Sequence, residues 1–225
     1  MTIIRTVLFD LDGTLADTAP DLGLALNLQR ERHGLPPLPQ ETIRPHASHG
    51  SRGLLGIGFG LTPEDAAFPA MREEYLDLYD AVFTRAPALF PGITGVLEVL
   101  EGAGLQWGVV TNKPRRFTGR LMQALGLDAR AACIVSGDDA PRPKPYPDTL
   151  LLACEIAQST PDNCLYVGDA ERDIVAGHAA GMRTAVARYG YLDAHDVPES
   201  WGAEFMIDAP QQLLVRLGLQ VPVII

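Results

Sequence analysis

The chain has 225 residues, of which 47% are hydrophobic and 20% charged, and its formal net charge is −10. This composition is typical of a soluble globular protein, and the acidic balance argues against nucleic acid, whose phosphates favour a basic surface. The three cysteines form no CxxC pair, no apolar run approaches a membrane span, and the N-terminus lacks the apolar core of a signal peptide. We therefore expect a cytoplasmic protein that binds neither nucleic acid nor membranes.

The pattern of predicted elements changes twice along the chain. An apolar segment at residues 5–9 is typical of a buried strand, and residues 17–85 then show helical patterns with no convincing strand. From residue 93 onward strands and helices alternate, which is typical of a parallel sheet. The strands predicted after that point lie near residues 105–111, 131–135, 164–167, 184–187 and 205–207.

The first strand is expected to join the sheet that resumes near residue 93, so the helical segment interrupts an α/β domain. We predict an α/β fold in which residues 1–16 and 86–225 form a Rossmann-like core around a parallel sheet. Residues 17–85 are predicted to form an inserted helical cap domain.

Two carboxylates, Asp10 and Asp12, stand where the first strand ends, and Gly13 follows them. In an open α/β sheet, ligands bind outside the carboxyl ends of the strands. Two like charges that face one cavity raise the free energy of the folded state unless a cation lies between them. A divalent metal or a basic residue is therefore expected here. The alternative is a solvated turn, since Asp and Gly are common in loops.

Polar residues also follow the next strands of the predicted sheet. Thr111 and Asn112 follow the second strand, where a hydroxyl and a helix N-terminus suit a phosphate group. Lys144 follows the third strand, and Asp169 and Asp173 follow the fourth. Because parallel strands end at the same edge of a sheet, we expect these groups and the first two aspartates to form one site.

These motifs, in this order and with a helical insertion after the first, resemble the phosphatases with a helical cap in the haloacid dehalogenase superfamily. The motifs read Asp10-Leu11-Asp12-Gly13-Thr14, Thr111-Asn112, Lys144-Pro145, and Gly168-Asp169 followed by Asp173. Segments at residues 107–114 and 188–191 resemble the branch that contains phosphoglycolate phosphatases and N-acetylmuramic acid 6-phosphate phosphatases. The resemblance implies a Mg²⁺-dependent phosphomonoesterase acting on a small phosphorylated metabolite, with 2-phosphoglycolate and N-acetylmuramic acid 6-phosphate as candidate substrates.

The resemblance also implies roles for individual residues. Asp10 would attack phosphorus and carry an aspartyl-phosphate, and Asp12 would act as general acid and then as general base. Mg²⁺ would bind the Asp10 carboxylate, the Asp12 backbone carbonyl and Asp169. Asp173 would hold a metal-bound water from the side of the next helix.

Three further residues would handle the phosphoryl group. Thr111 and Asn112 would hold its oxygens, and Lys144 would offset the charge that accumulates around phosphorus. Thr111 and Lys144 are thus expected to serve both catalysis and substrate binding. The metal and the lysine would make the electrostatic potential at the site positive, although the net charge of the protein is negative.

Asp12 favours phosphoryl transfer over dehalogenation, in which no leaving alcohol needs a proton. A phosphomutase would keep both aspartates and stays open as an alternative, as does a non-catalytic phosphometabolite-binding protein. Ala170 stands where many members carry Ser or Thr, which removes a hydroxyl near the metal motif. Asp138 and Asp139 are interpreted as part of a solvated turn.

The helical insertion is expected to select the substrate by closing over the site. Its candidate contacts are Arg44, His46, His49 and Arg52, which are interleaved with glycines. We take His49 and Arg52 as the residues that bind substrate, against the alternative that they are only solvated. The expected partner is a small phosphorylated metabolite, and the chain is expected to be a monomer or a homodimer.

Overall fold

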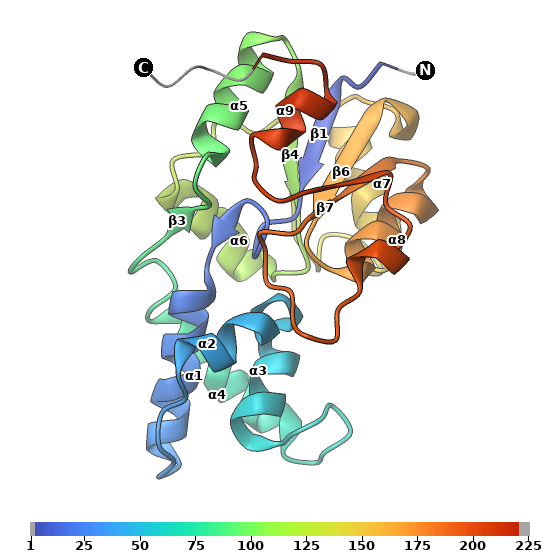
Figure 1. Cartoon of the computed structure of the whole chain (residues 1–225). Coiled ribbons are helices and arrows are strands. Elements are labelled where there is room, and N and C mark those ends of the chain that lie inside the picture. The colour runs from blue at the N-terminus through green and yellow to red at the C-terminus, as the bar shows by residue number, and fades with distance from the viewer. Residues whose placement is uncertain (1–2, 221–225) are drawn as a thin grey trace.

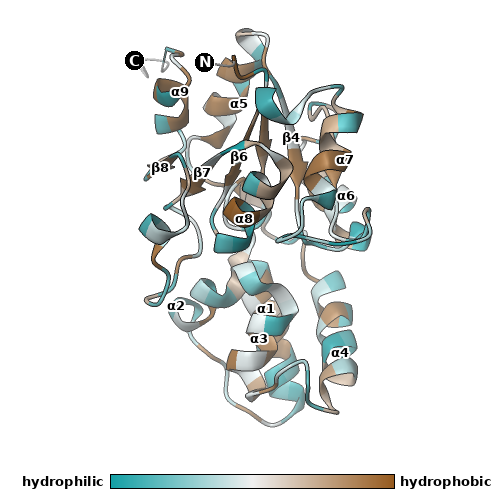
Figure 2. Cartoon of the chain, turned by 90° about the vertical axis from the view of Figure 1, so that its right-hand side faces the viewer, coloured by the Kyte–Doolittle hydropathy of each residue, from teal (hydrophilic) through white to brown (hydrophobic). Residues whose placement is uncertain are grey.

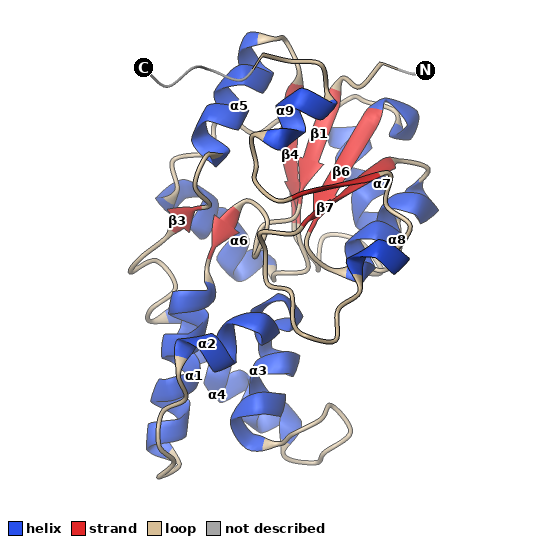
Figure 3. Ribbon diagram, viewed as in Figure 1, coloured by secondary structure: helices blue, strands red, loops and turns tan. Residues whose placement is uncertain are grey.

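The computed structural model describes residues 3–220, which form a parallel sheet flanked by helices and a group of helices beyond one end of the sheet (Figure 1). The strands of the sheet are drawn as red arrows in Figure 3. Their order is β5-β4-β1-β6-β7-β8, and every neighbouring pair is parallel. All six predicted strands are therefore present: β1 (Thr6–Phe9), β4 (Gln106–Val110), β5 (Ile134–Val135), β6 (Cys164–Gly168), β7 (Arg183–Ala187) and β8 (Phe205–Ile207).

Strand β1 lies between β4 and β6 and is buried along its whole length. Successive side chains of a strand point to opposite faces, so Val7 and Phe9 pack on one side of the sheet and Leu8 on the other. In Figure 2 the strands β4, β6 and β7 are brown, that is hydrophobic, while the helices packed on them also carry teal hydrophilic residues. A strand covered on both faces is expected to lack polar alternation, which explains the apolar texture of this segment.

Helices cover both faces of the sheet. The face of Val7 and Phe9 packs against α5 (Ile93–Gly102), α6 (Arg115–Ala124) and α9 (Gln212–Arg216). The face of Leu8 packs against α7 (Asp148–Ile156) and α8 (Glu171–Ala180). Two short 3-10 helices, η2 (Pro161–Asn163) and η3 (Pro198–Ser200), lie in the connecting loops.

The helices beyond the end of the sheet all come from the segment between β1 and β4, and we call them the cap. They are α1 (Ala19–Arg32), α2 (Gln40–Ile43), the 3-10 helix η1 (Arg44–His49), α3 (Gly50–Phe59) and α4 (Phe68–Asp80). Two short strands that the sequence did not predict, β2 (Ala16–Asp17) and β3 (Ala88–Leu89), pair antiparallel where the chain enters and leaves the cap. Two-residue strands carry too little periodicity to be recognised in a sequence.

Helix α3 lies in a glycine-rich stretch of the cap. Its buried residues Leu54 and Leu55 anchor it in the cap core. At Gly58 an added Cβ would meet the Leu26 side chain at 2.6 Å, so the glycine lets α3 lie close to α1. Tertiary packing thus outweighs the low helix propensity of glycine.

The last cap helix, α4, occupies only part of the region between α3 and β3. It begins at Phe68 and ends at Asp80, with Tyr75, Leu76 and Tyr79 buried. Among the described helices, none combines the length and the apolar character that a membrane crossing requires.

Candidate active site

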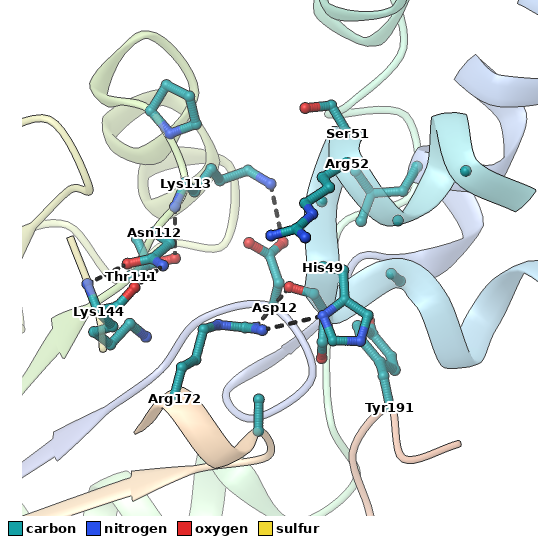
Figure 4. Close-up of a pocket in the computed structure, with 18 of the residues that line it drawn as sticks. Asp12, His49, Ser51, Arg52, Thr111, Asn112, Lys113, Lys144, Arg172 and Tyr191 are labelled. Atoms are coloured by element: carbon teal, nitrogen blue, oxygen red, sulfur yellow. Dashed lines mark hydrogen bonds and ion pairs between the residues drawn. The ribbon is translucent and has the colours of Figure 1, made fainter. Parts of the chain in front are cut away.

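The loops that follow β1, β4 and β6 meet beneath the cap, as expected from the order of these neighbouring strands. They contribute Asp10, Thr111 and Asp169 to a cavity of about 910 Å³, and the cap contributes residues of α3 and α4 to its other side. In Figure 4 the side chains of Asp12 and Arg172 from the core lie near those of His49 and Arg52 from the cap. Of the residues predicted to serve catalysis, to bind the metal or to bind the substrate, Asp173 alone is not among those that line the cavity.

Three of the four predicted metal residues lie together in what we call the acidic triad. Each of Asp10, Asp169 and Asp173 places one carboxylate oxygen within 4.8 Å of the others, and all three residues are buried. Burial raises the pKa of Asp10 to about 7, and the charges of Asp173 and Asp169 act in the same direction while Lys144 opposes them. Burial, and then the charge of Asp173, likewise raises the pKa of Asp169.

Lys144 offers the triad a buried positive charge. Its Nζ lies 2.9 Å from Oδ1 of Asp10 and 2.7 Å from Oδ1 of Asp173. The Tyr166 hydroxyl accepts a hydrogen bond of 2.7 Å from the same Nζ and donates to the Val110 carbonyl. One lysine among three carboxylates leaves a site rich in hard oxygen donors, and this donor set fits Mg²⁺.

Asn112 holds the Lys144 loop in place. Its Oδ1 accepts the Lys144 backbone N–H at 3.0 Å, and its Nδ2 donates to the Lys144 carbonyl at 2.9 Å. Both ends of the Asn112 side chain are therefore engaged, and a contact with a phosphoryl oxygen would fall to its backbone N–H. The neighbouring Thr111 hydroxyl accepts the Lys113 backbone N–H at 3.1 Å, and its own proton stays available to donate.

Asp12 is not a member of the acidic triad. Its Oδ1 lies 2.9 Å from Nζ of Lys113 and accepts a hydrogen bond from the Thr18 hydroxyl. Lys113 also lies over the ring of Tyr79 from α4, with its Nζ 4.8 Å from the ring centre. Two aspartates separated by one residue are thus held by two different lysines.

The turn after β1 requires a glycine between Asp12 and Thr14. Gly13 has a φ of +89°, and an added Cβ would meet Oδ2 of Asp169 at 2.1 Å. The close approach lets the Thr14 hydroxyl donate to Oδ1 of Asp169 at 3.1 Å. Any side chain at this position would push two of the motifs apart.

Of the four candidate contacts in the cap, the two that were predicted to bind substrate line the cavity. Arg52 is exposed and lines the cavity, and it makes no ion pair with any residue in the described part of the chain. His49 also lines it, and burial together with Arg172 lowers the pKa of His49. Arg44 instead pairs with Asp17 at 3.0 Å, and neither Arg44 nor His46 lines the cavity.

Several residues of the site carry no signal that we recognised in the sequence. Lys113 directly follows the Thr111-Asn112 motif, and Arg172 lies inside the last acidic motif. Their position beside these motifs is the only sequence feature that could have identified them. Burial would lower the pKa of Arg172, but the carboxylates around it raise it. Ser48 had no such marker, although its hydroxyl donates to Asp169 at 2.6 Å.

Two aspartates without a predicted role prove to support the loop after β5. Asp138 accepts the Arg115 backbone N–H at 2.8 Å at the first turn of α6, and Asp139 accepts the Ser136 backbone N–H at 2.8 Å. At the start of α8, Asp173 accepts the Ala170 backbone N–H at 3.0 Å. The missing hydroxyl at residue 170 therefore leaves this contact intact.

Comparison with known proteins identifies the family. The haloacid dehalogenase-like hydrolases match residues 7–187, so the chain belongs to that family. It is 42% identical over 214 residues to an N-acetylmuramic acid 6-phosphate phosphatase of Pseudomonas aeruginosa, with 94% of this chain and 93% of that protein covered. It is 40% identical over 213 residues to a phosphoglycolate phosphatase of Xanthomonas campestris pv. campestris, with 95% and 96% covered.

A solved structure shows the same fold. The crystal structure of a predicted phosphoglycolate phosphatase from Haemophilus somnus has a TM-score of 0.82 and 25% identity, and it covers 96% of this chain and 99% of its own. The family and the named relatives make this chain an enzyme, a phosphatase with a haloacid dehalogenase-like core and a helical cap.

Proposed function

We propose that the chain is a Mg²⁺-dependent phosphomonoesterase that hydrolyses a small phosphorylated metabolite through an aspartyl-phosphate on Asp10. The observation that carries the proposal is the separation of the two aspartates of the first motif. Asp10 lies in the acidic triad beside Lys144, while Asp12 lies outside it beside Lys113 and Thr18. Different surroundings for two similar groups are the usual basis for giving them different catalytic roles.

Asp10 is suited to be the nucleophile. Its Oδ1 accepts the Leu11 backbone N–H at 2.8 Å and contacts Lys144, whereas no hydrogen bond within residues 3–220 engages its Oδ2. A bond from Asp10 to phosphorus forms as the bond from phosphorus to the alcohol oxygen breaks, and Asp12 donates its proton to that oxygen. Asp12 then takes a proton from the water that attacks phosphorus, and the bond to Asp10 breaks as phosphate leaves.

The remaining residues stabilise the negative charge of the phosphoryl group and fix its orientation. Lys144 offsets negative charge on the phosphoryl oxygens, and the Thr111 hydroxyl and the Asn112 backbone N–H donate to them. Mg²⁺, when bound by Asp10, Asp169 and the Asp12 carbonyl, with Asp173 beside them, would neutralise the phosphoryl oxygens and fix their orientation.

The cavity favours a substrate larger than a two-carbon acid. Its volume of about 910 Å³ is near the upper end of ordinary ligand pockets, so 2-phosphoglycolate would leave much of it to water. N-acetylmuramic acid 6-phosphate would extend from the triad to α3 and α4. Both esters carry a carboxylate, for which Arg52 provides an uncompensated guanidinium, and His49 lies beside it on the cavity wall.

Phosphate release from a panel of esters tests the proposal. With Mg²⁺ present, the purified protein should hydrolyse N-acetylmuramic acid 6-phosphate faster than 2-phosphoglycolate, hexose phosphates and an aryl phosphate. EDTA should abolish release, and added Mg²⁺ should restore it. No release from any ester by folded, Mg²⁺-loaded protein would contradict hydrolysis, and phosphoryl exchange that needs a sugar bisphosphate would indicate a mutase.

We also propose, from the sequence, that the enzyme works in the cytoplasm as a monomer or homodimer and binds neither nucleic acid nor membranes. Its net charge of −10 supports the second part, because a polyanion would be repelled. Light scattering during gel filtration measures the assembly state directly.

A further inference from the structure

Ser48 connects the cap to the acidic triad. It belongs to η1, immediately before α3, and its hydroxyl donates to Oδ2 of Asp169 at 2.6 Å. Asp169 accepts two more hydrogen bonds, from the Thr14 hydroxyl at 3.1 Å and from the Tyr191 backbone N–H at 2.9 Å. Thr14 and Tyr191 lie outside the cap helices, so the Ser48 hydroxyl is the contribution of the cap to the orientation of this carboxylate.

Arg172 holds the same serine from the core. Its Nη2 donates to the Ser48 carbonyl at 2.6 Å, and its Nη1 lies 3.4 Å from Nδ1 of His49. Figure 4 shows Arg172 reaching across the cavity to His49. Arg172 directly precedes Asp173 on α8. The Ser48 side chain is thus hydrogen-bonded to Asp169, and its main chain is hydrogen-bonded to Arg172, the neighbour of Asp173.

These contacts exist only while the cap lies over the cavity. Thr14 and the Tyr191 backbone belong to the core, whereas the Ser48 hydroxyl belongs to the cap and reaches Asp169 because the cap lies over the cavity. Hydrogen bonds that involve a carboxylate or a guanidinium are stronger and more directional than neutral ones. Donors that contact a metal-binding carboxylate fix its orientation and thereby its affinity for the ion.

We propose that Ser48 and Arg172 are positioning residues that couple closure of the cap to the geometry of the metal site. Closing the cap adds the third donor to Asp169 and holds its carboxylate toward the rest of the triad. Linkage requires the effect to be reciprocal, so Mg²⁺ bound at the triad must in turn favour the closed cap. This inference rests on the proposed function, because Mg²⁺ is the ion that the triad is proposed to bind.

Mg²⁺ titration and hydrogen exchange test the coupling without any turnover. Calorimetry measures Mg²⁺ affinity, and hydrogen–deuterium exchange of residues 44–59 measures cap closure with and without Mg²⁺. In the wild type, Mg²⁺ should slow exchange in this segment. In Ser48→Ala, Mg²⁺ affinity should fall about 10- to 100-fold, the range for loss of a donor to a metal ligand, and saturating Mg²⁺ should no longer slow exchange.

Thr42→Val is the matched control. Thr42 lies in the same cap on α2, is exposed, and its hydroxyl makes no hydrogen bond within residues 3–220. This variant should retain wild-type Mg²⁺ affinity and wild-type slowing of exchange. Arg172→Met, which leaves the Ser48 hydroxyl in place, should lose the slowing, and it keeps the test decisive if Ser48→Ala does not fold.

The two proposals fail in different ways. If Ser48→Ala and Arg172→Met bind Mg²⁺ as the wild type does and show the same slowing, the coupling is overturned and the metal site stands. If the wild type itself binds no Mg²⁺, the proposed metal-dependent function is contradicted first.

Discussion

The charged side chains named here on the two walls of the cavity differ in how firmly they are held. On the sheet side, Lys144, Asp169 and Asp173 are each at most 2% exposed and bonded to several neighbours. On the cap side, Arg52 is exposed and unpaired in the described part of the chain. Fixed, desolvated charges suit a reaction that is the same for every phosphate ester, because they need no reorganisation as charge develops. A charged side chain without a fixed partner, such as Arg52, suits recognition of the alcohol part of the ester, which differs from one substrate to another.

This difference predicts a graded set of effects, in which sheet-side changes abolish chemistry for every substrate and cap-side changes alter preference. The largest effect is expected at Asp10. Asp10→Asn keeps the shape of the side chain but removes the nucleophile, so kcat should fall by about 10⁴-fold or more, as for other covalent catalysts. Phosphate release measures the loss, and circular dichroism should show an unchanged fold. Retention of a tenth of the activity on any ester would exclude Asp10 as nucleophile.

A change at Lys113 should separate substrates by their leaving group. Lys113→Met removes the cation that holds the Asp12 carboxylate at 2.9 Å. Turnover of alkyl phosphates, which need a proton on the leaving oxygen, should fall about 10²-fold, the usual contribution of a general acid. Turnover of p-nitrophenyl phosphate, whose leaving group needs no proton, should fall much less.

Lys113→Arg is the matched control, because it preserves the positive charge beside Asp12 and should retain most of the activity on both kinds of ester. Equal losses on both esters in Lys113→Met would show that Lys113 does not act through Asp12.

A smaller effect is expected on the cap side. Arg52→Met should raise KM about 10-fold for esters that carry a carboxylate, the effect of losing one hydrogen bond between charged groups, with little change in kcat. An aryl phosphate without a carboxylate serves as the control and should show an unchanged KM. A fall in kcat for both substrates would place Arg52 in the chemistry of phosphoryl transfer.

The smallest effect concerns stability and pH. The pKa of Asp10 rises from the ordinary value of 3.8 to about 7 in the folded, metal-free protein. Between these values the folded state binds more protons than the unfolded state, so unfolding becomes easier as the pH rises. In EDTA, Tm should therefore fall by a few degrees between about pH 4 and pH 7.

Asp10→Asn removes the titrating group and should weaken this dependence, and saturating Mg²⁺ should reverse the loss at pH 7 because the ion binds the ionised carboxylates. A metal-free Tm that rises steadily with pH over this interval would contradict the account of Asp10.

The contrast between the walls also explains what the sequence predicts well. Asp10, Thr111 and Asp169 each directly follow a buried strand, and parallel topology brings such residues to one edge of the sheet, so these three could be placed from the order of motifs alone. The interactions around them were less visible. The engagement of Asn112 with the Lys144 backbone depends on a contact across 32 residues that no local pattern records.

The cap was harder to predict because tertiary packing, and not local propensity, determines it. Glycine normally disfavours a helix, yet α3 forms because Leu54 and Leu55 are buried and Gly58 admits Leu26. Arg44 and Arg52 have the same chemistry in the sequence, but one pairs with Asp17 and the other faces the cavity. Ser48 belongs to no recognisable motif, and its hydroxyl contacts Asp169 only through the packing of the cap against the core.

The most direct test of the central claim is to trap the covalent intermediate. Enzyme mixed with a saturating ester and Mg²⁺ is quenched in acid within one turnover, digested, and analysed by mass spectrometry. The account predicts a phosphoryl group on the peptide that contains Asp10, located on Asp10 itself, and none in the Asp10→Asn variant. Phosphate released within that turnover with no phosphorylated peptide at any time point would contradict it.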